Sequence, residues 1–321
     1  MTTLLIFREQ IRSFYQRFQR GLKPLGKFFM ASLLFWSLNE LFQYSEMFGK
    51  LPVLIGIAVI CMWLPIGAIF FLSVLYISIQ LASVVPQIAI LYIGLFLFAY
   101  LIYLRLEIKS CLPILLLPIA FAYHVPYIVP ILVGMFLGPV GILPTAFGIF
   151  LYFFSIHVKE IVSLIGTTQN GESEVYRYLL EQVFMDKQMI LMILVFALVI
   201  GIVWVWYHLQ RDEAWNQAIV IGGIAGMLLF LALGYMLDVQ VEIVNLLVGF
   251  IIAVFIGLVV QFFKCIVDYS RVEYVQFEDD EYYYYVKAIP KVSVAQREVS
   301  IKRINTRKHV KNNDESTEEV K

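Results

Sequence analysis

Charge is missing from two long stretches of this chain. No Asp, Glu, Lys or Arg occurs from Leu51 to Leu104, and none occurs from Ser110 to Val158. A membrane-crossing helix needs about 20 apolar residues, so each stretch can hold more than one crossing. With 61% hydrophobic and 15% charged residues, the composition excludes a soluble globular enzyme and a disordered chain. The sequence therefore predicts a polytopic membrane protein.

Cysteines are few, and recognisable catalytic motifs are absent. Cys61, Cys111 and Cys265 are far apart and form no CxxC pair, which argues against a zinc site or a disulfide framework. The chain has no P-loop, no GxGxxG, no HExxH and no GxSxG sequence. We therefore expect a non-enzymatic protein with no catalytic residues, no cofactor, no metal site and no nucleic-acid partner.

The first residues have the pattern of a basic amphipathic helix. One face of residues 1–23 is apolar, and it consists of Leu4, Phe7, Ile11, Phe14, Phe18 and Leu22. The residues off that face include Arg8, Arg12, Arg17 and Arg20. Such a helix is expected to lie on the anionic inner leaflet of the bilayer; packing on a protein surface is the alternative. Pro24 and Gly26 are expected to end it and to turn the chain into the membrane.

The apolar segments predict an all-α membrane domain with eight transmembrane helices, or ten. The expected crossings before residue 105 are 28–44, two within 51–84 on either side of Pro65, and 87–104. The proline-rich block 112–156 is expected to form either three short segments or one crossing with a re-entrant hairpin. The last three crossings are expected at 189–207, 217–236 and 243–263.

The positively charged residues predict that both termini are cytoplasmic. The segment 1–27 carries six basic residues and one acid, Glu9. Lys264, Arg271 and the basic stretch that runs to Lys311 follow the last crossing. Loops rich in Lys and Arg stay on the cytoplasmic side, and an even number of crossings agrees with this. The polar loop 157–188 is then extracytoplasmic, with a short amphipathic helix expected at 172–187.

The most unusual segment combines glycine and proline in apolar surroundings. Its special residues are Gly134, Gly138, Pro139, Gly141 and Pro144. Small residues let helices approach closely, which favours a tight packing centre. Broken helices also mark substrate sites in transporters, so a substrate pathway is the alternative. A second GxxxG pair, Gly222 and Gly226, lies in an ordinary helix and is expected to serve packing.

Ionisable groups within the apolar segments are scarce. Asn39 and Glu40 are the polar pair expected within a crossing or near its outer end. His157 and Glu160 share one helical face, and an interfacial pair is expected there rather than a metal ligand set or a proton shuttle. A proton- or sodium-driven pump needs buried carboxylates, so this scarcity argues against one.

The C-terminal segment is predicted to be a small β-rich cytoplasmic tail at 264–305, followed by a disordered end at 306–321. Strand-forming residues at 272–277 and 282–286 flank an acidic turn, which predicts a β-hairpin. A third strand is expected at 292–301.

Four consecutive tyrosines stand out in this tail, namely Tyr282, Tyr283, Tyr284 and Tyr285. Strand side chains alternate between two faces, so these tyrosines cannot all face one core. Exposed aromatic residues beside an acidic turn favour a docking surface for a protein partner. Contact with the membrane headgroups is the alternative.

The tail string from Asp268 to Lys291, DYSRVEYVQFEDDEYYYYVKAIPK, resembles the tails of uncharacterised multi-pass membrane proteins from clostridial-type Gram-positive bacteria. The resemblance implies a bacterial protein of the cytoplasmic membrane and carries no known activity.

Two functions are therefore expected from the sequence. The favoured one is a non-enzymatic subunit or scaffold of a cell-envelope complex, docked to a cytoplasmic partner through the tail. The alternative is a permease for a small or lipid-like substrate with its pathway around 112–156. An intramembrane enzyme that uses Glu40, or His157 with Glu160, is a third and weaker expectation.

Overall fold

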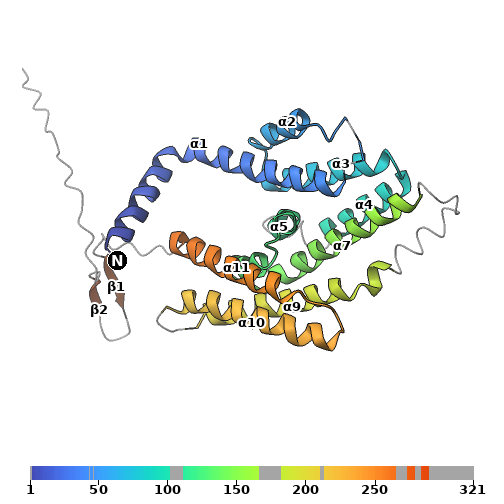
Figure 1. Ribbon diagram of the computed structural model, residues 1–321. Helices are drawn as coiled ribbons and strands as arrows, with labels where there is room; N and C mark the ends of the chain where they lie inside the picture. The colour runs from blue at the N-terminus through green and yellow to red at the C-terminus, as the bar shows by residue number, and fades with distance from the viewer. Residues whose placement is uncertain are drawn as a thin grey trace, which may run out of the picture. The chain divides into compact units, whose positions relative to one another are not determined.

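The computed structural model describes residues 2–42, 44–45, 47–101, 111–165, 182–209, 213–264, 273–278 and 283–288. The chain forms two units. The helical unit is Ile11–Ile266, and the terminal unit combines Met1–Gln10 with Val267–Lys321. Most described residues of the helical unit are helical (Figure 1).

The described helices follow one another along nearly the whole helical unit. The first five are α1 (Thr2–Leu41), α2 (Leu51–Cys61), α3 (Ile66–Ala82), α4 (Pro86–Ala99) and α5 (Cys111–Ala122). The others are α6 (Ile128–Phe136), the short 3-10 helix η3 (Gly138–Gly141), α7 (Ile142–Ile165), α9 (Lys187–Tyr207), α10 (Ala214–Met236) and α11 (Ile243–Lys264).

Four stretches of helix in the described part of the chain are long and apolar enough to cross a membrane. They are Gly138–Val162, Lys187–Tyr207, Ala214–Met236 and Ile243–Lys264. The apolar helices α2 and α5 have 11 and 12 residues. A helix rises about 1.5 Å per residue and the hydrocarbon layer is about 30 Å thick, so neither spans alone. These helices point to a membrane protein, and the count of eight or ten crossings stays a prediction.

The first helix does not end where the sequence suggested. The prediction that Pro24 and Gly26 end it is wrong, because α1 continues through both to Leu41. A proline inside a helix removes one backbone hydrogen bond, and the remaining bonds of this 40-residue helix continue on both sides of Pro24. The non-helical backbone lies instead at Phe18 (φ −107°, ψ 16°). The interfacial segment and the first expected crossing are therefore parts of one kinked helix.

The proline-rich block consists of two short helices followed by one long one. The helices α5 and α6 have 12 and 9 residues, and α7 has 24. The prediction that a loop begins at residue 157 is wrong, because α7 continues to Ile165. Polar residues alone do not end a helix, and the first glycine after this stretch is Gly166. Within the expected helix at 172–187, residues 172–181 lie outside the described residues.

The helix α9 packs against α6, α7 and α10, and α11 packs against α10 and α6 (Figure 1). Glycines let α10 approach its neighbours: a Cβ on Gly226 would lie 2.6 Å from Cε1 of Phe250 on α11.

At the end of α11, the Lys264 ammonium donates a hydrogen bond of 2.7 Å to the Met135 carbonyl of α6. It also lies 4.3 Å from the centre of the Phe136 ring. A cation at the C-terminal end of α6 stabilises that helix end.

The terminal unit contains an antiparallel hairpin of β1 (Glu273–Glu278) and β2 (Tyr283–Ala288). The two strands coincide closely with the two runs of strand-forming residues in the sequence. Phe277 pairs with Tyr284, and Gln276 pairs with Tyr285. The third strand expected at 292–301 and the end at 306–321 lie outside the described residues.

Candidate functional site

The glycine–proline stretch forms a tight contact with α9. A Cβ on Gly134 would lie 2.8 Å from Cβ of Val203. Gly138 has a φ of +63°, and a Cβ there would lie 2.5 Å from Cδ1 of Trp204. Two positions on the α6–η3 segment thus need the absence of a side chain to admit α9, and the second also needs glycine for its backbone conformation. Both features favour the packing role over a substrate pathway.

Of the other residues singled out in this stretch, Gly141 and Pro144 are buried and Pro139 is not. A Cβ on Gly141 would collide with Cγ1 of Val133 and lie 3.1 Å from Cβ of Leu137, so this glycine lets η3 fold back on α6. Pro144 is buried in the first turn of α7, where a missing N–H costs no helical hydrogen bond. Pro139 is exposed.

The neighbours Asn39 and Glu40 lie in two different environments: Asn39 is half-buried and Glu40 is exposed. The Tyr76 hydroxyl donates to Oδ1 of Asn39 at 3.0 Å and accepts from Nε2 of Gln80 at 3.0 Å. The fully buried Gln80 also accepts the backbone N–H of Ser45 at 2.8 Å. Asn39 thus belongs to a structural network between α1 and α3.

Glu40 is exposed, and its Oε1 accepts the indole N–H of Trp36 at 3.0 Å. The Lys159 ammonium donates to the Glu40 carbonyl oxygen at 3.1 Å. Glu40 is the penultimate residue of α1, so it lies at a helix end. Its expected place within a crossing or near the outer end of one stays a prediction.

His157 lies between two carboxylates, one of which the sequence did not point out. Its Nδ1 is 3.3 Å from Oε2 of Glu160, as the helical spacing predicts, and its Nε2 is 2.9 Å from Oδ2 of Asp186. Asp186 also caps α9, because its Oδ1 accepts the backbone N–H groups of Gln188 at 2.8 Å and Met189 at 3.1 Å. The cluster ties the end of α7 to the start of α9. An aspartate directly before an apolar helix was the available signal, since that is a preferred N-cap residue.

We expect Asp186→Ala to lower the free energy of unfolding by about 1–3 kcal/mol, because it removes both the cap and the contact with His157. Asp186→Asn keeps a capping oxygen and should lose less. Glu213→Ala is the matched control, since Glu213 precedes α10 without a side-chain cap. Thermal unfolding in detergent, followed by tryptophan fluorescence, gives the unfolding midpoint of each variant and so ranks their stabilities. Equal midpoints for Asp186→Ala and Glu213→Ala would contradict the assignment.

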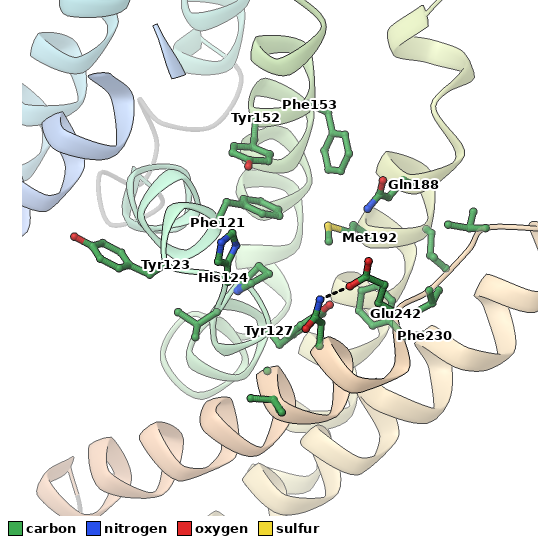
Figure 2. Close-up of a pocket in the computed structure, with 18 of the residues that line it drawn as sticks. Phe121, Tyr123, His124, Tyr127, Tyr152, Phe153, Gln188, Met192, Phe230 and Glu242 are labelled. Atoms are coloured by element: carbon green, nitrogen blue, oxygen red, sulfur yellow. Dashed lines mark hydrogen bonds between the residues drawn. The ribbon is translucent and has the colours of Figure 1, made fainter. Parts of the chain in front are cut away.

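A cavity of about 670 Å³ lies beside this cluster. Its walls come from the end of α5 and the α5–α6 turn, from α7, from the start of α9, and from α10 and α11 with their connection (Figure 2). Buried Phe121, Phe153, Met192 and Phe230 contribute apolar surface. None of the five glycines and prolines singled out between 134 and 144 lines this cavity. Sequence reasoning missed it because its walls come from four separate parts of the chain.

The tyrosines of the tail are exposed on both faces of the hairpin. The exposed fractions are 69% for Tyr283, 39% for Tyr284 and 76% for Tyr285. Alternation along β2 puts Tyr283 and Tyr285 on one face and Tyr284 on the other. Tyr282 lies outside the described residues.

Comparisons with known proteins give no information about the function of this chain. No protein-family model matches this chain, and no curated protein or solved structure is similar to it.

Proposed function

We propose that this protein is a multi-pass subunit or scaffold of a bacterial cell-envelope complex that docks a cytoplasmic partner through its C-terminal hairpin. The observation that carries the proposal is the exposure of Tyr283 and Tyr285 together on one face of β2. Tyrosine is enriched at protein interfaces because it offers a large apolar surface and a hydroxyl group. The resemblance of the tail to those of clostridial-type membrane proteins fits this placement.

The proposed location is the cytoplasmic membrane, with eight or ten crossings and both termini in the cytoplasm. Large apolar side chains on the outward faces of α10 and α11 support the membrane location; Leu228 is 59% exposed and Phe255 is 68% exposed. Such surface is stable in contact with lipid. On α1, the exposed Phe14 and Phe18 support contact of residues 1–23 with the anionic inner leaflet.

A permease for a small or lipid-like substrate is the second candidate. The cavity favours it, because Phe121, Tyr127 and Tyr152 belong to the block 112–156. The close packing around Gly134 and Gly138 argues against a pathway through that part of the block.

The docking proposal predicts loss of a partner when the hairpin is removed. Affinity purification in mild detergent, followed by mass spectrometry, should recover a protein with the full chain and lose it after deletion of 272–304. Tyr283→Ser with Tyr285→Ser should weaken recovery more than about tenfold, because two interface aromatics are removed.

Tyr235→Ser is the matched control, since Tyr235 is a 90% exposed tyrosine at the end of α10. It should leave recovery unchanged. Undiminished co-purification after deletion of 272–304, with the membrane domain still inserted, would refute docking through the tail.

A further inference from the structure

The cavity beside α9 has an apolar wall built from aromatic rings. The rings of Phe121 and Tyr152 stack with centres 3.8 Å apart and an angle of 7° between their planes. The Tyr127 ring lies 5.3 Å from the ring of Phe230 and packs over Gly249. A Cβ on Gly249 would lie 2.5 Å from Cδ2 of Tyr127, so this glycine makes room for the aromatic wall.

The rim of the cavity is polar and exposed. It includes His124, Gln188, Gln240, Glu242 and Asn245. Nδ2 of Asn245 donates a hydrogen bond to Oε2 of Glu242. Glu242 is labelled in Figure 2, where a dashed line marks a hydrogen bond of its carboxylate. This contact orients the carboxylate at the rim.

The cavity lining contains one carboxylate, that of Glu242, and no Lys or Arg. Lys187 is exposed next to the rim residue Gln188 but does not line the cavity. The faces of aromatic rings carry negative potential and attract cations. The carboxylate favours a positive charge in an occupant, and an aromatic wall is compatible with that charge.

We propose that this cavity is a binding site for an organic cation with an apolar body. The apolar body would lie against Phe121, Phe153 and Phe230, and the positive charge would lie near Glu242. A volume of about 670 Å³ is within the range of small-molecule sites. The inference is independent of the docking proposal, because it uses no residue of the tail.

The test uses two probes of the same shape and opposite charge, tetraphenylphosphonium and tetraphenylborate. Each is titrated against the full-length protein in lipid nanodiscs, and the signal from empty nanodiscs is subtracted. We expect saturable binding of tetraphenylphosphonium at one site per chain. Glu242→Gln keeps an acceptor for Asn245 and removes the charge, so it should weaken that binding about fivefold. Glu242→Lys should weaken it further.

Glu213→Gln is the matched control, since it neutralises an exposed carboxylate that does not line the cavity. It should leave tetraphenylphosphonium binding unchanged. Three results would each overturn the proposal: no saturable binding of tetraphenylphosphonium, equally tight saturable binding of tetraphenylborate, or the same affinity in Glu242→Gln as in the unaltered protein. Size-exclusion chromatography of each variant separates loss of binding from loss of fold.

Discussion

Gly138→Ala is expected to lower the free energy of unfolding by about 2–5 kcal/mol. Gly138 has a φ of +63°, a conformation that costs an L-residue with a side chain roughly 1–2 kcal/mol. The new methyl group would also lie 2.5 Å from Cδ1 of Trp204, and overpacking of this kind costs roughly 1–3 kcal/mol. Thermal unfolding of the purified protein in detergent gives the measurement.

Gly201→Ala provides the control on the same helix as Trp204. A Cβ at position 201 would meet nothing within 4 Å, so the added methyl group is accommodated. Alanine is also the better helix former, by roughly 0.5–1 kcal/mol. We expect this variant to be as stable as the unaltered protein or more so. A Gly138→Ala variant that unfolds at the same temperature as Gly201→Ala would show that the η3–α9 contact is not tight.

Gln80→Leu is expected to cost about 1–3 kcal/mol, because it leaves the Ser45 backbone N–H without its acceptor. It also removes the donor to the Tyr76 hydroxyl, which joins Gln80 to Asn39. The connection between the end of α1 and α3 should therefore loosen, and Ser45 should exchange its amide hydrogen faster. Hydrogen exchange read by mass spectrometry reports this locally.

Gln87→Leu is the control for that substitution. Gln87 lies in the first turn of α4, is half-buried, and makes no side-chain hydrogen bond to the described residues. Its replacement should change neither the unfolding temperature nor the exchange at Ser45. If both leucine variants behave alike, the loss reflects a general effect of glutamine removal rather than this network.

The sequence indicated more about elements than about their ends. Apolar length alone gave the positions of α9, α10 and α11 to within a few residues. The ends of α1 and α7 were misjudged because one proline, Pro24, and the polar residues after His157 do not by themselves end a helix. The two runs of strand-forming residues coincide with the paired strands β1 and β2, and the β-rich tail as a whole stays a prediction.

For the site residues too, contacts within one helix could be predicted from the sequence and contacts between helices could not. The glycines at 134, 138 and 141 were recognisable as unusual, and the sequence favoured a packing role for them with a substrate pathway as the alternative. The closeness of Val203 and Trp204 favours packing, and that closeness depends on how α6 and η3 meet α9. Glu160 was recognisable as a neighbour of His157, because both lie on one helix. Asp186 was not, because its contact joins residues on two helices.

By itself, the sequence determined the chemical character of this protein: long uncharged apolar segments, a basic N-terminal segment and a tyrosine-rich tail. These properties depend on composition and on spacing along one element, where 3.6 residues per turn or alternation along a strand fixes the neighbours. Only the tertiary structure decided that the glycine–proline stretch is a contact surface, that His157 meets Asp186, and that aromatic rings and Glu242 enclose a cavity. Those facts arise from contacts between separate elements, and the spacing of residues along the chain does not encode them.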